Sequence, residues 1–380
     1  MFADGLAKCW TAVFARARAP LCAAGFALLA GCLSNSEPLL IPVDQAPEGG
    51  QVVDLLAITT RAPSDVAGQI YSGERSREVS SHLIQVSVPP NHELGRLEWP
   101  SGSQPDAENE FAALTLQPAV PEEAWSWFDA RGNEGRLLIF VHGYNVSFPE
   151  AVYRLAQITA DVTVDAAPVL FSWPSNGDLL GYYYDKESAT AARDAFERVL
   201  TEAAARDGVT QITLLAHSMG SWITMETLRQ MAIRRGDLPA KITDVILAAP
   251  DLDIHVFEHQ FESLGEARPH FTFLVSSDDR ALGLSKVLAG GVQRLGAMDP
   301  SQEPYRSRIE ATPGVTVVDL SGIEADGTRH NKFAESEEMM TFARRAMGDQ
   351  QNRATARGSI GAQAGAVIVA LGLGVADLSE

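Results

Sequence analysis

The sequence predicts an α/β fold in which one mostly parallel, eight-stranded sheet carries helices on both faces. From residue 53 onward, short apolar runs rich in β-branched residues alternate with longer segments of helical periodicity. The runs in the middle of the chain are apolar without interruption, as is typical of strands buried on both faces. The 380 residues, 46% of them hydrophobic, provide enough apolar side chains for a large core.

Eight segments are expected to be strands, separated by turn residues or helical patterns. They are residues 53–60, 83–88, 137–141, 169–172, 212–216, 245–248, 271–275 and 315–320. Apolar residues recur at three- and four-residue spacing between the later strands, which predicts helices around residues 152–162, 189–199 and 222–232. In sheets of this kind, ligands bind at the carboxyl ends of the strands.

Composition divides the chain into four expected parts. They are a signal peptide (1–31), a flexible tether rich in Pro, Gly and Glu (32–52), one folded domain (53–347) and an apolar or disordered tail (348–380). Basic residues and the short apolar stretch 21–31 precede Cys32, and this stretch is too short to span a bilayer.

The end of the expected signal peptide, Leu29-Ala30-Gly31-Cys32, resembles the lipobox of bacterial lipoproteins. This resemblance implies that Cys32 is diacylated and becomes the mature amino terminus, which places the protein in the bacterial cell envelope. Leu33 at the next position favours the outer membrane, on its periplasmic side. An ordinary secretory signal is the alternative.

Acidic residues outnumber basic ones, 49 to 30, and give a net charge of −19. This charge repels phosphate backbones and anionic lipids, so we expect no nucleic-acid partner and a membrane contact made by the Cys32 lipid. All three cysteines precede residue 33, which excludes cysteine-based metal sites from the body of the protein. No phosphate loop, dinucleotide fingerprint or metal-ligand cluster occurs, so we expect no cofactor and no metal.

One motif combines a buried strand, a serine and an amphipathic helix. Residues 213–221 read Thr-Leu-Leu-Ala-His-Ser-Met-Gly-Ser, with Ser218 at the junction. Small residues, Ala216 and Gly220, lie two positions before and after it, as a sharp nucleophile-bearing turn requires. A serine that merely caps the following helix is the alternative.

A second motif, His142-Gly143-Tyr144, follows the expected strand 137–141. With Ala-His-Ser-Met-Gly downstream, the chain resembles the α/β-hydrolase superfamily. The resemblance implies that Ser218 is a nucleophile and that the backbone N–H groups of Tyr144 and Met219 form an oxyanion hole.

The superfamily order places an acid and then a histidine after the nucleophile. His330, in a polar loop after the last expected strand, is the expected base, while His255, His259 and His270 are less well placed. The segment after strand 271–275 resembles the S-x-x-D-x-A-L pattern of a bacterial family of esterase- or lipase-like hydrolases, which selects Asp279. The other acids that we considered are Asp278, Asp251 and Asp253.

The family resemblance spans roughly residues 53–345 and includes 60–63, 72–76 and 171–175, to which it assigns no role. A substrate pocket is expected near the motif residues, and packing within the protein is the alternative for its aromatic members. The expected pocket residues are His142, Gly143, His217, Trp173 and Tyr184. Together these observations predict a serine hydrolase that cleaves small ester or lipid substrates through an acyl-enzyme. The alternatives are a thioesterase, an acyltransferase, a peptidase and a non-catalytic envelope scaffold. The sequence predicts no oligomeric state.

Overall fold

The computed structural model describes residues 38–131, 134–163, 165–176, 181–325, 327–341, 343–344 and 366–369. The chain divides into two units, residues 1–37 and residues 38–380. The expected signal peptide and Cys32 lie outside the described residues. In the described part of the chain, no helix is both long and apolar enough to cross a membrane.

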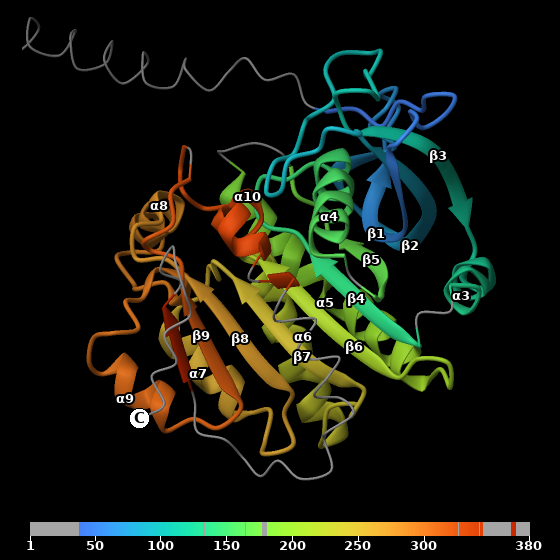
Figure 1. Cartoon of the computed structure of the whole chain (residues 1–380). Coiled ribbons are helices and arrows are strands. Elements are labelled where there is room, and N and C mark those ends of the chain that lie inside the picture. The colour runs from blue at the N-terminus through green and yellow to red at the C-terminus, as the bar shows by residue number, and fades with distance from the viewer. Residues whose placement is uncertain are drawn as a thin grey trace, which may run out of the picture. The chain divides into compact units, whose positions relative to one another are not determined.

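The domain is built on one sheet of ten strands in the order β10-β9-β8-β7-β6-β4-β5-β1-β2-β3 (Figure 1). The strands are β1 Gln51–Pro63, β2 Tyr71–Val88, β3 Ala112–Ala119, β4 Arg136–Val141, β5 Ala167–Ser172, β6 Gln211–His217, β7 Ile242–Ala248, β8 His270–Val275, β9 Val315–Asp319 and β10 Ala366–Val369. Neighbours from β10 to β1 are parallel, while β2 pairs antiparallel with β1 and β3 antiparallel with β2.

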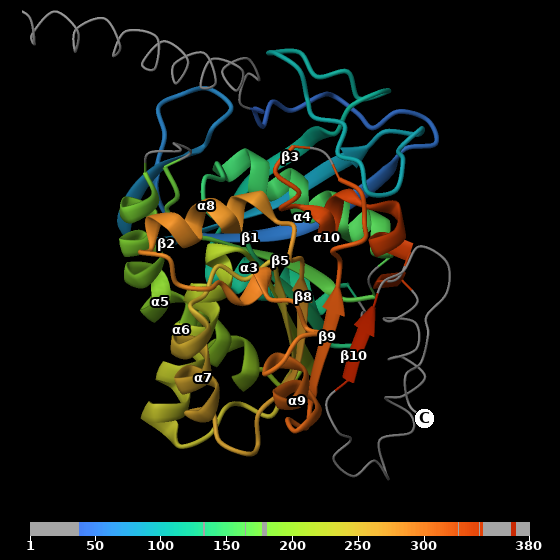
Figure 2. The same ribbon diagram turned by 90° about the vertical axis from the view of Figure 1, so that its left-hand side faces the viewer.

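Helices cover both faces of this sheet, as the α/β prediction requires. They are α3 Pro121–Asp129, α4 Phe148–Val162, α5 Tyr182–Ala205, α6 Met219–Arg235, α7 Ile254–Glu262, α8 Arg280–Leu288, α9 Tyr305–Glu310 and α10 Lys332–Glu335. Alternate residues of β4 enter different cores: Leu137 and Ile139 join the core that contains α5 and α6, while Leu138 joins the core of α4. Figure 2 shows α5, α6 and α7 together on one side of the sheet, with α8 and α10 near the arrowheads of β8 and β9.

The predicted fold class is confirmed, and all eight expected strands exist, but the predicted number of strands was wrong. The sequence analysis missed β3, an edge strand that contains Pro118, because proline removes a ladder donor and is tolerated only at a sheet edge. It also missed β10, which lies in the tail 348–380 and pairs in parallel with β9. The rest of that tail lies outside the described residues.

The later part of the expected tether, residues 32–52, belongs to the folded domain. The backbone N–H of Leu40, a buried residue, donates to the carbonyl of Gly68 (2.7 Å), and that of Val43 donates to Ala113 (2.9 Å). The hydroxyl of Tyr153 donates to the carbonyl of Leu39 (2.9 Å). Residues 39–43 are therefore held on the domain, and β1 already begins at Gln51. The cause is the apolar run Leu-Leu-Ile-Pro-Val at residues 39–43, in which Leu40 is buried; the Pro, Gly and Glu residues around it dominate the composition of the stretch.

Candidate active site

Ser218 occupies a strained turn between β6 and α6. Its backbone has φ 52° and ψ −120°, a combination that non-glycine residues adopt only where the surrounding structure imposes it. The residue is 4% exposed, and its side chain makes no hydrogen bond that caps α6. The alternative of a helix-capping serine is therefore excluded by the geometry.

Close packing explains the small residues around Ser218. A Cβ atom on Gly220 would lie 2.4 Å from the carbonyl oxygen of Val141 and 2.5 Å from that of His142. Only glycine therefore allows α6 to begin this close to the end of β4. Ala216, two residues before the serine, is completely buried in β6.

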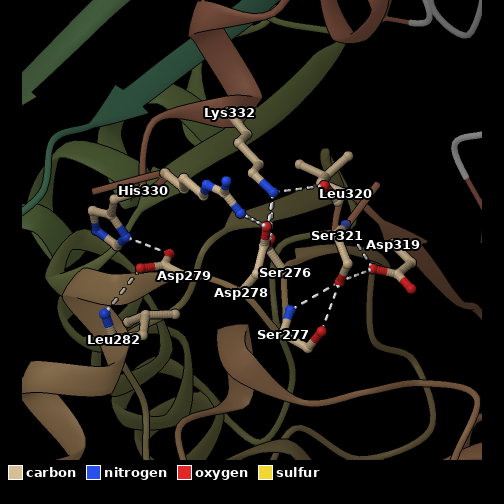
Figure 3. Close-up of polar contacts among 11 residues, drawn as sticks. Ser276, Ser277, Asp278, Asp279, Leu282, Asp319, Leu320, Ser321, His330 and Lys332 are labelled. Atoms are coloured by element: carbon tan, nitrogen blue, oxygen red, sulfur yellow. Dashed lines mark hydrogen bonds and ion pairs between the residues drawn. The ribbon is translucent and has the colours of Figure 1, made fainter. Parts of the chain in front are cut away.

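The expected acid and base contact each other directly (Figure 3). Nδ1 of His330 lies 2.6 Å from Oδ2 of Asp279, and the side chains are 14% and 0% exposed. The other oxygen of Asp279 accepts the backbone N–H of Leu282 in the first turn of α8 (2.9 Å). Both oxygens of the carboxylate are thus used, which fixes the imidazole with Nδ1 protonated and leaves Nε2 free to act as a base.

His330 also lies beside the serine turn. Its ring centroid is 4.7 Å from that of His217, the residue that precedes Ser218. Within the described residues, the Ser218 hydroxyl makes no hydrogen bond, so the serine and the imidazole are not yet bonded to each other. Such contacts often tighten only when substrate binds.

Asp278, the second candidate acid, has different partners. Its Oδ1 lies 2.6 Å from Nζ of Lys332 (Figure 3). Its Oδ2 lies 2.8 Å from Nη1 of Arg329. Lys332 is buried, and it also donates to the hydroxyl of Ser276 and the carbonyl of Leu320, both at 3.0 Å. The two adjacent aspartates therefore have different roles: Asp279 orients His330, and Asp278 stabilises the loop that carries His330.

Among the residues that the structure describes, the remaining candidate acids contact no histidine side chain. Asp251 accepts hydroxyl hydrogen bonds from Ser285 (2.6 Å) and Tyr182 (3.0 Å) and lies 3.2 Å from Nε of Arg294. Asp253 accepts backbone N–H groups at the start of α7.

The remaining candidate bases are also placed away from a catalytic acid. The side chains of His255 and His259 are exposed on α7, and each imidazole lies within 4 Å of a glutamate on the same helix. His270 lies at the start of β8, at the opposite end of the sheet, where Nε2 is 3.1 Å from the hydroxyl of Thr316. Of the acid and base pairings that the sequence allowed, the structure forms only Asp279 with His330 in the described part of the chain.

The loop that carries Tyr144 packs against the serine turn. A Cβ atom on Gly143 would lie 3.0 Å from Cβ of Ser218 and 2.9 Å from Nδ1 of His217. Met219 is the first residue of α6, where a backbone N–H has no acceptor within the helix. The two expected oxyanion donors, Tyr144 and Met219, thus belong to the two backbone segments that meet at Ser218.

Two of the expected pocket residues are packed inside the protein instead. The ring of His142 stacks on that of Trp173 (5.0 Å, 14°), both are buried, and Nε1 of Trp173 donates to the carbonyl of His142 (2.8 Å). This corrects the pocket prediction for both residues, because buried rings leave no surface for a substrate.

The side chains of the other two expected pocket residues, His217 and Tyr184, also pack against other residues of the protein. His217 is buried and stacks on Phe333 (4.5 Å), whereas Tyr184 donates its hydroxyl to the carbonyl of Gly73 (3.2 Å) beneath the guanidinium of Arg75. Burial is the main cause that lowers the pKa of His142, to about 3, and that of His217, well below its usual value. Both imidazoles are therefore neutral at pH 7.

Comparison with known protein families identifies the family of the folded domain. Residues 122–347 match the family described as "Alpha/beta hydrolase of unknown function (DUF900)". The match spans more than half of the chain. The chain belongs to this family. Membership of an alpha/beta hydrolase family supports a hydrolase activity.

Individual relatives of this alpha/beta hydrolase are distant. Uncharacterized protein alr1448 of Nostoc sp. is 29% identical over 121 residues, which are 25% of this chain and only 31% of the relative. A lipase-esterase related protein from Clostridium acetobutylicum is 12% identical, with a TM-score of 0.32 over 58% of this chain and 94% of its own. A hyperthermophilic esterase from Pyrobaculum calidifontis is also 12% identical, with a TM-score of 0.36 over 80% of this chain and 86% of its own.

Several residues of the site escaped the sequence analysis. Lys332 and Arg329, which bind Asp278, follow and precede His330, but a lysine or arginine in a polar loop carries no signal of burial. The buried Arg61 lies in the segment 60–63, to which the family resemblance assigns no role. Among the described residues, no group of three or more histidine, cysteine or acidic side chains is arranged to hold a metal ion.

Proposed function

We propose that this protein is a serine hydrolase that cleaves carboxylic esters through an acyl-enzyme intermediate. The observation that carries the proposal is the Asp279–His330 contact of 2.6 Å beside a serine held at positive φ. A strained serine and a buried acid–imidazole pair are costly to maintain, and they belong together in nucleophilic catalysis. This favours an enzyme over a non-catalytic scaffold.

In the proposed reaction, Oγ of Ser218 attacks the ester carbonyl carbon while Nε2 of His330 takes the hydroxyl proton. The carbonyl oxygen becomes an oxyanion that accepts hydrogen bonds from the N–H groups of Tyr144 and Met219. The carbon–oxygen bond to the alcohol then breaks, and His330 protonates the departing alcohol. A water molecule repeats the sequence on the acyl-enzyme, and Asp279 stabilises the imidazolium in both halves.

Substrate class is tested by comparing bonds that differ in their leaving group. The purified protein should be assayed for kcat/KM with p-nitrophenyl esters of increasing chain length, an acyl thioester and a p-nitroanilide. We expect the highest value for an ester, because an alcohol leaves without the full protonation that an amine requires. A higher value for the thioester or the anilide would reassign the protein to the thioesterases or the peptidases.

We also propose that a lipid on Cys32 holds the domain at the bacterial envelope. The support is the sequence Leu29-Ala30-Gly31-Cys32, together with the anionic charge of the chain, which disfavours electrostatic attachment to anionic lipids. Residues 39–43 are hydrogen-bonded to the rest of the domain, so the stretch of sequence between Cys32 and the domain is short.

Substitution of the proposed lipidation site tests this attachment. Cys32→Ser should shift the protein from the membrane fraction to the soluble fraction or leave an unprocessed precursor. The matched control, Cys22→Ser, should leave attachment unchanged. If mass spectrometry finds that the amino terminus of the wild-type protein carries no acyl groups, the proposal is contradicted.

A further inference from the structure

The three segments to which the family resemblance assigns no role, residues 60–63, 72–76 and 171–175, meet at the side chain of Arg61. This arginine lies near the carboxyl end of β1, and it is 1% exposed. A Cβ atom on Gly73 would lie 2.9 Å from the carbonyl oxygen of Ser175, so the second and third segments pack without space between them.

The guanidinium of Arg61 has an acceptor for each of its five N–H groups. Nε donates to the hydroxyl of Ser172 (2.8 Å), and Nη1 donates to the carbonyls of Ser175 (2.9 Å) and Ser72 (3.2 Å). Nη2 donates to the carbonyl of Val146 (2.7 Å) and to Nε2 of His142 (3.3 Å). No carboxylate touches it within the described residues, so its role is to organise backbone rather than to form an ion pair.

Two of these acceptors, His142 and Val146, enclose the loop that carries Tyr144. Nδ1 of His142 lies 2.9 Å from the carbonyl oxygen of Gly143, which therefore accepts its proton. Nε2 is then an acceptor for Arg61, and burial together with the Arg61 charge keeps the pKa of His142 at about 3. One cation thus holds the carbonyl of Val146 directly and that of Gly143 through His142.

Asp185 holds the N–H groups of the same loop from α5. Its Oδ2 accepts the backbone N–H of Asn145 (3.3 Å) and the hydroxyl of Ser175, whose oxygen accepts the N–H of Val146 (3.1 Å). The carboxylate is completely buried. Arg61 and Asp185 therefore fix both the carbonyl and the N–H side of residues 143–146.

We propose that Arg61 is a positioning residue for the oxyanion hole: it holds residues 143–146 so that the N–H of Tyr144 is aimed at the reacting carbonyl oxygen. This inference rests on the proposed function, in which that N–H stabilises the transition state. A preorganised donor is worth more than a mobile one because it does not have to reorient as charge develops, and losing one such donor costs about 10²- to 10³-fold in kcat.

The test compares Arg61→Met and Arg61→Lys with Arg75→Met. Arg75 is a matched control because it lies in the adjoining segment 72–76, where it donates to Ser188 and Tyr184 and does not touch the loop. Reactive sites are counted by end-point titration with a fluorophosphonate, and kcat and KM for a p-nitrophenyl ester are expressed per titrated site. Affinity for a phenylboronic acid, which forms a tetrahedral anion on the serine, is measured in parallel.

For Arg61→Met we expect a loss of about 10²-fold in kcat per titrated site, little change in KM and weaker boronate binding. Arg61→Lys should recover only part of the loss, because an ammonium cannot reach acceptors in a fork. Unchanged kcat per site, with only fewer titrated sites or a lower melting temperature, overturns the proposal and makes Arg61 purely structural.

If Arg61→Met does not fold, Ser172→Ala is used in its place, because it removes one acceptor of Arg61. We then expect a smaller loss of kcat per titrated site, and an unchanged kcat per site overturns the proposal. A wild-type protein that hydrolyses no ester and binds no fluorophosphonate refutes the proposed function instead, so the two failures are distinguishable.

Discussion

Ser218→Ala should lower kcat for ester hydrolysis by about 10⁴- to 10⁶-fold, because removal of the nucleophile eliminates the acyl-enzyme route. The folded structure should be preserved, since the Ser218 side chain makes no hydrogen bond that caps α6. The measurement is the initial rate of p-nitrophenyl ester hydrolysis by purified wild type and variant at equal concentrations of folded protein.

Ser221→Ala is the matched control for this change. Ser221 lies in the same first turn of α6 and is buried, and its hydroxyl donates to the carbonyl of Ala216 (3.2 Å). We expect its kcat to stay near that of the wild type. If activity survives Ser218→Ala but is lost in Ser221→Ala, the nucleophile is Ser221 and the assignment of Ser218 is wrong.

Asp279→Asn should lower kcat by about 10⁴-fold, the cost of losing the carboxylate that fixes the imidazole tautomer in a serine triad. The asparagine would present an amide to Nδ1 of His330 in place of an acceptor-only carboxylate, while the 0% exposure of the site prevents water from substituting. The readout is kcat for the ester, with circular dichroism as the check on folding.

Asp278→Asn separates catalysis from support of the loop. It should keep most of the activity, because Asp278 does not contact His330, but it should lower the melting temperature. Lys332, with a side chain only 2% exposed, would lose its carboxylate partner, and an uncompensated buried charge is strongly destabilising. If Asp278→Asn folds but is inactive, the catalytic acid is Asp278 instead of Asp279. If both aspartate variants remain active and Asp251→Asn does not, the acid follows β7 instead.

The elements that sequence analysis located are those whose signals are local. The nine residues 213–221 contain the whole motif of a buried strand, a serine and flanking small residues, so they predict the turn by themselves. The structure places that serine, Ser218, at φ 52°. His330 and the pair Asp278-Asp279 could be located because each follows a strand, and parallel strands bring their carboxyl ends together. The choice of Asp279 over Asp278 rested on the family resemblance. The order of the motifs along the chain then supplied the pairing.

The features that sequence analysis missed depend on tertiary burial. Arg61 and Lys332 have long cationic side chains, a type that usually lies in solvent, yet both are buried, and their acceptors include backbone carbonyls distant in sequence. His142 and Trp173 were expected near substrate because they follow adjacent strands, but ring orientation decides exposure, and these rings face each other. Period and spacing do not encode such contacts.

Covalent trapping tests the central claim of a Ser218 nucleophile most directly. Wild-type protein is incubated with a fluorophosphonate, and the modified residue is located by proteolysis and tandem mass spectrometry, with Ser218→Ala treated in parallel. We predict a single phosphonyl adduct on Oγ of Ser218 and none in the variant. An adduct on another serine with Ser218 unmodified, or an unlabelled protein that nevertheless hydrolyses esters, would contradict this account.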